Sequence, residues 1–487
     1  MENTQSTSIE LTHALDSKPP FLASLFAAMQ HLLAMIVGVA TPPILIGSAL
    51  NLSPENITYL VSMSLFMSGI GTFVQVKRLG GFIGSGLLTV QATSFAYPAT
   101  IISIGTSFLA AGMSQDQMLS TIFGVLFAGS FVTIFASRLL PMLRKVISPT
   151  VSGITVMLIG ISLVEVGMTD FAGGYASKLD GSFGSMENLL LGFIVLASIL
   201  LFFRSRSQYV RMSAIILGMT IGYLVALYMG KTDFNAFNNV PLYNLPVPFK
   251  FGLFQIDWQA FFLIGFVYLV VIIEAVGALT ATCMLCDRPI TGKEYNQRIS
   301  GGVLADGVIS AIASVFNAFP LTAFSQNNGV IQMTGVASRK VGLFVAALLI
   351  IFGLFPVISI IFTSLPKPIL GGATLILFGT VAAAGIGIIT QVTLDRRESM
   401  IIAVSIGVAL GAAFVPDAIA QLPPMLQKML GTPAIAGGLT ALMVNLLLPR
   451  PVPQSIRKAE SVRKVREKFE VPTQDKTRSA AEQKGST

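Results

Sequence analysis

Charged residues are scarce in this chain. They make up 11% of its 487 residues, whereas hydrophobic residues make up 53%. A soluble protein carries about 25% charged residues, because its surface faces water. The mean hydropathy of +0.77 supports the same conclusion. The composition excludes a soluble globular protein and predicts an integral membrane protein with many spanning helices, each needing about 20 apolar residues.

Cysteine and histidine are almost absent, with two residues of each. Cys283 and Cys286 form a C-x-x-C pair, but no second pair and no nearby histidine completes a metal site. We expect both cysteines to be small packing residues near a helix end, and we expect no metal and no organic cofactor. An enzyme is disfavoured because His31 is the only histidine within an apolar run. ATP-driven transport is disfavoured because the chain contains no Walker loop.

Basic residues concentrate at the carboxyl end of the chain, whose formal net charge is +8. Ten of the 31 lysines and arginines follow Pro449. We expect the segment 450–487 to be a cytoplasmic tail beside anionic lipid and not a nucleic-acid-binding surface. The polar segment 1–19 is expected to be a second cytoplasmic tail and not a cleaved signal peptide, because the apolar run after it is too long.

Hydropathy predicts fourteen membrane spans, two of which, 82–104 and 318–337, are irregular. Basic residues such as Arg138, Arg204 and Arg298 fall in alternate loops, whereas the intervening loops hold few. Because basic loops stay in the cytoplasm, this alternation places both termini there. The fourteen predicted spans lie near residues 21–50, 57–76, 82–104, 118–140, 147–168, 188–203, 211–230, 257–286, 299–317, 318–337, 341–363, 369–390, 398–415 and 430–448.

A short motif occurs twice, which indicates an internal repeat. The two copies lie 219 positions apart and share five residue types: Pro149, Gly153, Thr155, Leu158 and Gly160 match Pro368, Gly372, Thr374, Leu377 and Gly379. They fall in the fifth and twelfth spans, which cross the membrane in opposite directions. The fold class predicted is therefore an all-α polytopic membrane protein with a 7+7 inverted repeat, as in many secondary transporters.

Two spans are interrupted by polar residues that lie between proline and glycine. The segment 319–335 holds three consecutive amides, Gln326, Asn327 and Asn328, and the segment 84–98 holds Gln91 and several hydroxyls. Polar groups at membrane depth must line a cavity or be buried in protein. We expect short β-like breaks in these two spans and a binding site for a small polar substrate between them.

Two acidic residues lie within predicted spans, where an unpaired charge costs at least about 2.5 kcal/mol. Glu274 is the only ionisable side chain in the run 261–284. It could titrate during a transport cycle, or it could be a buried group hydrogen-bonded for packing. Asp306 could couple transport to an ion, or it could hold the broken backbone of the interrupted spans. A lone histidine such as His31 is more often a structural group.

This mixture of side chains suits a planar ligand that is rich in hydrogen-bond donors and acceptors. Phe95 could stack on its face, and Gln326 could pair with an edge that presents adjacent N–H and C=O groups. Glu274 could accept from another N–H group. Phosphate and sulfate are disfavoured because the spans contain no paired arginine or lysine. A nucleobase or a similar heterocycle fits best.

These segments resemble the signatures of the nucleobase–ascorbate transporter family. The segment 326–335 is similar to the family's Asn-x-Gly-x4-Thr signature, 91–95 to its motif in the third span, and 30–35 to its motif in the first. The similarity covers about residues 19–449 and is closest to bacterial xanthine and uric acid permeases. It implies proton-coupled uptake of a purine across the cytoplasmic (inner) membrane by an elevator-like movement, in a homodimer.

The resemblance also implies two domains and a set of residue roles. A core domain would comprise 20–140 and 257–365, and a gate domain that forms the dimer would comprise 141–256 and 366–449. Five residues would bind the substrate: Glu274, Gln326, Phe95, Ser94 and Ser325. Four more would serve coupling or architecture: Asp306, Asn327, His31 and Gln91.

Ala278 departs from the pattern of the xanthine carriers in this family. Those carriers typically have a second acid one turn after Glu274, whereas urate-selective members have an apolar residue there. The amide of Gln326 favours a purine over uracil, since uracil carriers tend to have glutamate at this position. Xanthine and uric acid both stay open, and the alternatives are another nucleobase such as uracil or an anion exchanger of the same fold.

Overall fold

The computed structural model describes residues 11–143, 147–232, 242–390 and 392–449. Residues up to Asn445 form one compact unit. Of the second unit, Leu446–Thr487, only residues 446–449 belong to the described part. The predicted carboxyl-terminal tail 450–487 and residues 1–10 of the predicted amino-terminal tail lie outside the described residues.

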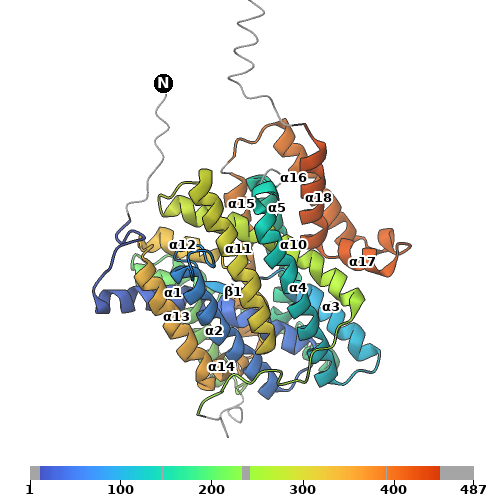
Figure 1. Cartoon of the computed structure of the whole chain (residues 1–487). Helices are drawn as coiled ribbons and strands as arrows, with labels where there is room; N and C mark the ends of the chain where they lie inside the picture. Colours follow the sequence, from blue (N-terminus) through green and yellow to red (C-terminus); the bar gives the residue numbers. More distant parts are fainter. Residues whose placement is uncertain (1–10, 144–146, 233–241, 391, 450–487) are drawn as a thin grey trace, which may run out of the picture. The chain divides into compact units, whose positions relative to one another are not determined.

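The chain is mainly helical, as the sequence predicts (Figure 1). Among the described residues, nine helices are long and apolar enough to cross a membrane, and up to eleven spans result if each of two bent helix pairs is one span. The nine are α1 (Phe21–Ala49), α2 (Pro54–Lys77), α4 (Gln115–Leu143), α5 (Pro149–Phe171), α7 (Met186–Phe203), α10 (Trp258–Leu285), α11 (Gly292–Val315), α15 (Lys367–Ile389) and α16 (Arg396–Phe414).

Shorter helices occupy the remaining predicted spans. The bent pairs are α13 (Arg339–Leu354) with α14 (Pro356–Thr363), and α17 (Pro424–Leu430) with α18 (Pro433–Leu447). The other predicted spans contain α3 (Tyr97–Ala110), α9 (Ala214–Tyr228) and α12 (Gln326–Thr334), and two further short helices are α6 (Ala176–Asp180) and α8 (Gln208–Met212). The count of fourteen spans stays a prediction.

Both irregular spans contain the β-like break that the sequence predicts. β1 (Gln91–Thr93) and β2 (Leu321–Ala323) form a buried antiparallel pair, in which Gln91 lies opposite Ala323. Figure 1 shows β1 in the interior, among the helices. Because the strands are antiparallel, α3 and α12 leave the pair in opposite directions, and the amino terminus of each helix faces the strand pair. Helix amino termini carry a partial positive charge, which favours electron-rich groups there.

The two helices that carry the sequence repeat pack closely against each other. α5 and α15 run antiparallel, since Gly153 lies against Gly385 whereas Gly371 lies against Phe171. A Cβ atom on Gly160 would lie 2.4 Å from the backbone nitrogen of Ala382, so only glycine permits this approach. Opposite directions for the two copies are what an inverted repeat requires.

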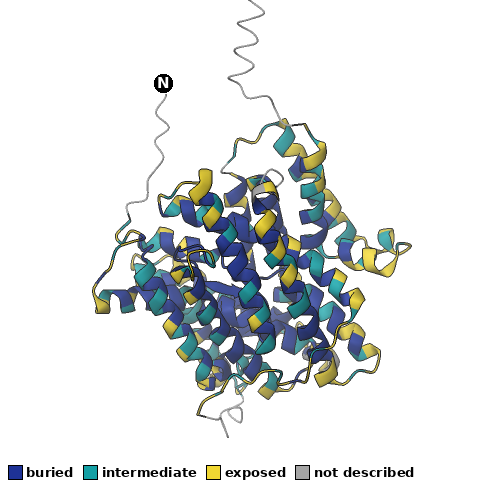
Figure 2. Cartoon of the chain, viewed as in Figure 1, coloured by how far each residue is buried: buried dark blue, intermediate teal, exposed yellow. Residues whose placement is uncertain are grey.

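Apolar side chains are exposed on the outside of several helices. On α7, Phe193 is 60% exposed and Leu201 is 70% exposed. Figure 2 shows buried residues gathered in the interior of the helical unit and exposed ones along its rim. An apolar exterior of this extent needs lipid or another apolar surface against it. The chain is an integral membrane protein.

Candidate functional site

Glu274 meets the first interrupted span inside the helical unit. It lies in the middle of α10, and it is only 6% exposed. The hydroxyl of Ser94, directly after β1, donates a hydrogen bond of 2.6 Å to Glu274 Oε2. Among the described residues this is the only side-chain hydrogen bond of Glu274. A buried carboxylate with one partner keeps most of its accepting capacity for a ligand or a proton.

The turn after β1 fixes the position of the Ser94 hydroxyl. Its oxygen accepts a hydrogen bond of 3.1 Å from the backbone nitrogen of Ala96, and α3 begins at Tyr97. Pro98 lies in the first turn of α3, where backbone N–H groups have no acceptor within the helix. Because proline has no N–H group, it leaves no donor unsatisfied at this position. The break in the span therefore presents the Ser94 hydroxyl to Glu274 of α10.

Asp306 of α11 holds the strand pair. Its Oδ1 accepts from Gln75 Nε2 at 2.7 Å and from Gln91 Nε2 at 2.9 Å, and its Oδ2 accepts from Thr322 Oγ1 at 2.9 Å. One carboxyl thus connects β1, β2 and α2. These are the contacts that an architectural role requires, while a coupling role stays a prediction.

Two of the three consecutive amides attach α12 to its surroundings. Asn327 is hydrogen-bonded to His31 Nδ1 of α1 at 2.9 Å and donates to the carbonyl of Leu88 at 2.7 Å. Asn328 donates to the carbonyl of Ala278 at 3.1 Å and accepts from Thr282 Oγ1 at 2.7 Å. These contacts fix the start of α12 against α1 and α10.

Gln326 and Ser325 are the polar side chains at the start of α12 that remain for a ligand. Gln326 is half-buried and is the first residue of the helix. The Ser325 hydroxyl is buried and has no hydrogen-bond partner among the described residues. A buried hydroxyl without a partner is costly unless a ligand or water completes it. Both residues therefore suit the binding role that the resemblance implies.

The Phe95 ring packs against two other phenylalanines. Its centroid is 6.2 Å from that of Phe324 and 5.4 Å from that of Phe378, which it meets edge-on. Phe95 follows β1, Phe324 follows β2, and Phe378 belongs to α15. An aromatic group from α15 thus meets the strand pair, and these rings can provide apolar faces for a planar ligand.

Ala278 lies one helical turn after Glu274 and is 2% exposed. Its carbonyl accepts from Asn328, which joins α10 to α12 beside the carboxyl. The structure thus brings the residues singled out in the sequence to one region around the strand pair. It also adds residues that sequence reasoning missed: Gln75, Thr322, Thr282 and Phe378.

Metal ligands do not gather in the described part of the chain, where no group of three or more histidine, cysteine, aspartate or glutamate residues could hold an ion. Cys283 and Cys286 are free and buried. The groups at the strand pair can form hydrogen bonds, provide aromatic faces and bind a proton on a carboxyl.

The chain is similar to a known protein family and to individual proteins of that family. A family model described as "Permease family" matches residues 22–418. The chain is 45% identical to xanthine permease XanQ of Escherichia coli (strain K12) over 449 residues, which cover 92% of this chain and 96% of that protein. It is 34% identical over 425 residues to uric acid permease PucJ of Bacillus subtilis (strain 168), covering 86% of this chain and 91% of that protein.

Two solved structures share the fold at low sequence identity. The transmembrane domain of the cyanobacterial bicarbonate transporter BicA matches with a TM-score of 0.53 and 17% identity, covering 87% of this chain and 96% of that chain. SLC26A9 matches with a TM-score of 0.58 and 12% identity, covering 88% of this chain and 66% of that chain. At these identities the likeness concerns the fold alone.

Proposed function

The chain belongs to the nucleobase–ascorbate transporter family. We propose that it takes up a purine nucleobase, xanthine and/or uric acid, together with protons. The relatives are permeases, so the chain is a transporter and not an enzyme. The relatives named xanthine permease and uric acid permease support the substrate class. The single observation that carries the proposal is the Ser94–Glu274 pair beside the strand break, where α12 begins with Gln326.

Each polar group has a role in binding the purine. Glu274 accepts a hydrogen bond from a purine N–H, and Gln326 pairs with an edge that presents adjacent N–H and C=O groups. Phe95 stacks on the ring, while Ser94 and Ser325 lie beside these groups. Glu274 also takes up and releases the coupling proton, because burial with one partner makes its ionised form costly.

Transport uses an elevator-type movement of a core domain, 20–140 with 257–365, against a gate domain, 141–256 with 366–449. Support comes from the antiparallel packing of the repeat helices α5 and α15 and from Phe378 of α15, which meets Phe95. The protein works as a homodimer through the gate domain in the bacterial inner membrane, with both termini in the cytoplasm. The basic loops predicted on the cytoplasmic side support this orientation.

Uptake of labelled xanthine and uric acid by cells that express the chain tests this function. We expect a protonophore to abolish uptake, and we expect Glu274→Gln to lower it by at least tenfold because the titratable group is lost. Gln259→Ala, at an exposed position of the same helix, serves as the control. Uptake that persists with a protonophore and follows sodium instead would contradict the proton coupling.

Ala278→Asp tests the choice between the two purines. The added carboxyl lies one turn from Glu274, so we expect the ratio of xanthine to uric acid uptake to rise. Competitive uptake with xanthine, uric acid, hypoxanthine, guanine and uracil measures the change, and Ala278→Asn controls for the added volume because it matches aspartate in size without its charge. An unchanged profile would place position 278 outside the determinants of selectivity.

A second candidate function is anion exchange, the alternative that the sequence leaves open, since a bicarbonate transporter has the same fold. An anion site would not use the Gln326 amide. If the protein exchanges anions, Gln326→Ala should leave transport unchanged. If it transports purines, we expect the same substitution to lower the affinity for the purine by at least tenfold.

A further inference from the structure

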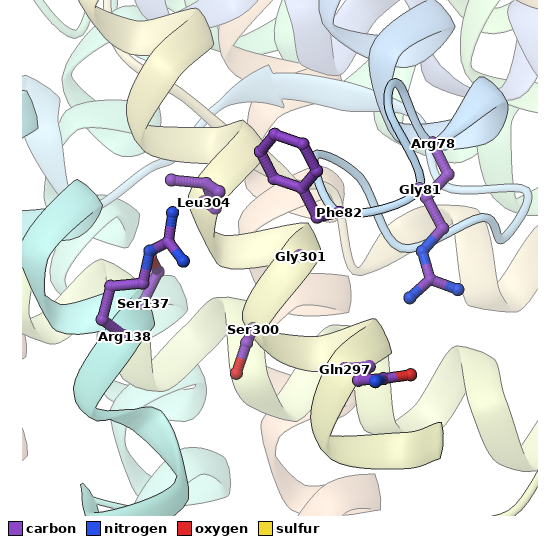
Figure 3. A pocket seen from close by; sticks show the side chains of 9 residues that line it. All are labelled: Arg78, Gly81, Phe82, Ser137, Arg138, Gln297, Ser300, Gly301 and Leu304. Carbon is purple, nitrogen blue, oxygen red and sulfur yellow. The ribbon is translucent and has the colours of Figure 1, made fainter. Parts of the chain in front are cut away.

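A cavity with two arginines in its lining lies away from the strand pair, between the end of α2, α4 and α11. It has a volume of about 220 Å³. Figure 3 shows Arg138 of α4 on one side and Arg78 on the other, with the α11 face that carries Gln297 and Ser300 between them. Phe82 completes the lining from the loop after α2. None of these residues belongs to the proposed purine site.

Neither arginine of this cavity forms an ion pair in the part of the chain that the structure describes. Arg138 is exposed and makes no ion pair among the described residues. Arg78 Nε is buried and has no hydrogen-bond partner there. Two neighbouring arginines differ, since Arg298 is paired with Glu294 and Arg339 with Asp16. Two guanidinium charges without a carboxylate partner at one cavity favour an anion there, because an anion would offset their charge.

Positive charges outnumber negative charges around Arg78. Burial lowers the pKa of Arg78, and the charges of Arg298 and Arg339 lower it further, against a smaller opposite effect of Glu294. The guanidinium nevertheless stays charged at neutral pH. The cavity lining, within the described part of the chain, contains two arginines and no carboxylate.

We propose that this cavity binds a phosphate group. Guanidinium groups match phosphate oxygens with two parallel hydrogen bonds, and the side chains of Ser300 and Gln297 can donate to the remaining oxygens. This site is separate from the proposed purine site, because it lies outside the strand pair. It would bind a negatively charged group and not a planar ring. The phosphate could belong to an anionic phospholipid or be free in solution.

A phospholipid headgroup has additional support from the surroundings. Phe82 is 55% exposed beside the arginines, and Phe135 and Leu139, which neighbour Arg138 on α4, are 68% and 52% exposed. These side chains offer an apolar surface for acyl chains next to the charged cavity. The loop after α2 belongs to the set that we propose to be cytoplasmic, the side on which basic pockets meet anionic lipid.

Thermal unfolding of the purified full-length protein in neutral detergent tests the proposal in two arms. One arm adds phosphatidylglycerol against phosphatidylcholine, and the other adds inorganic phosphate against chloride at equal ionic strength. We expect phosphatidylglycerol to raise the Tm saturably, with a half-saturating concentration at least tenfold higher in Arg78→Gln/Arg138→Gln. Arg204→Gln/Arg206→Gln removes the same charge at exposed positions outside the cavity and should retain the wild-type response.

The two arms separate the sources of the phosphate. A response to phosphatidylglycerol alone identifies a lipid site, and a response to inorganic phosphate that the cavity variant loses identifies a site for free phosphate. The proposal is overturned if neither reagent raises the Tm relative to its control. It is also overturned if the cavity variant and the control variant respond equally.

Discussion

Gln75 uses every hydrogen-bonding group of its amide at the centre of the site. Its Nε2 donates to Asp306 Oδ1 at 2.7 Å and to the carbonyl of Gly302 at 2.8 Å, and its Oε1 accepts from the backbone nitrogen of Ser85 at 2.9 Å. The side chain is completely buried. It therefore joins α2 to α11 and orients the carboxyl that holds both strands.

Replacing Gln75 should disturb the site without touching the substrate. Gln75→Ala leaves buried groups of Asp306, Gly302 and Ser85 short of a partner, at about 1–3 kcal/mol for each unsatisfied group. We expect a lower Tm and a loss of purine uptake of at least tenfold. Thermal unfolding and uptake measure the two effects. The exposed Gln259→Ala is the control, and wild-type uptake by Gln75→Ala would contradict the architectural role of this network.

For individual residues, the sequence predicts the polar members of the site better than the apolar ones. Glu274, Asp306 and Gln91 stand out because polar side chains are exceptions in apolar runs. Gln75 obeys the same rule and could have been found, since it lies in the apolar run 57–76. Phe378 could not, because an aromatic residue in an apolar helix gives no sign of which surface it meets.

Among the elements, the contact between α5 and α15 depends on glycine. A Cβ atom on Gly385 would lie 2.3 Å from the backbone nitrogen of Met157, whereas one on Gly387 would have nothing within 4 Å. Backbone atoms cannot move aside as a flexible side chain can. The two helices therefore keep their spacing only while position 385 lacks a side chain.

Gly385→Ala should accordingly destabilise the protein, while Gly387→Ala should not. We expect Gly385→Ala to cost about 1–3 kcal/mol, as overpacked sites do. Gly387→Ala should be neutral or slightly stabilising, because alanine is the better helix former. Thermal unfolding of both variants in the same detergent compares them. Equal Tm values for the two variants would show that α5 and α15 separate easily.

The amino-terminal segment shows what periodicity cannot predict at the scale of elements. Within the predicted tail 1–19, the backbone of His13 pairs with the segment after α12 through Gly335 at 3.1 Å and Ala337 at 2.8 Å. Asp16 adds ion pairs to Arg288 and Arg339. A polar stretch this short carries no hydrophobic pattern, so its contact with the segment after α12 could not be predicted from the sequence.

For the molecule as a whole, several contacts join the proposed core and gate domains, and two of them are short hydrogen bonds to a serine hydroxyl and to a backbone carbonyl. Lys367 Nζ at the start of α15 donates to Ser48 Oγ of α1 at 2.5 Å. Gln208 Nε2 of α8 donates to the carbonyl of Met333 in α12 at 2.6 Å. By contrast, the contact of 3.2 Å between Thr58 of α2 and Thr363 of α14 lies within the proposed core. If the core moves as a unit, the first two contacts must break during transport and the third must persist.

Cross-linking can therefore distinguish a moving core from a rigid protein. A short bifunctional thiol reagent that bridges Ser48→Cys and Lys367→Cys should abolish purine uptake, because it ties α1 to α15 and prevents the movement. The same reagent on Thr58→Cys with Thr363→Cys should leave uptake near the wild-type level, since both helices belong to the proposed core. Uptake before and after the reagent, with each single-cysteine variant as a control, measures the effect, and mass spectrometry confirms that the bridge has formed. A bridged Ser48–Lys367 pair that still transports purine would contradict the elevator-type movement, because the two domains would then be working without changing their relative position.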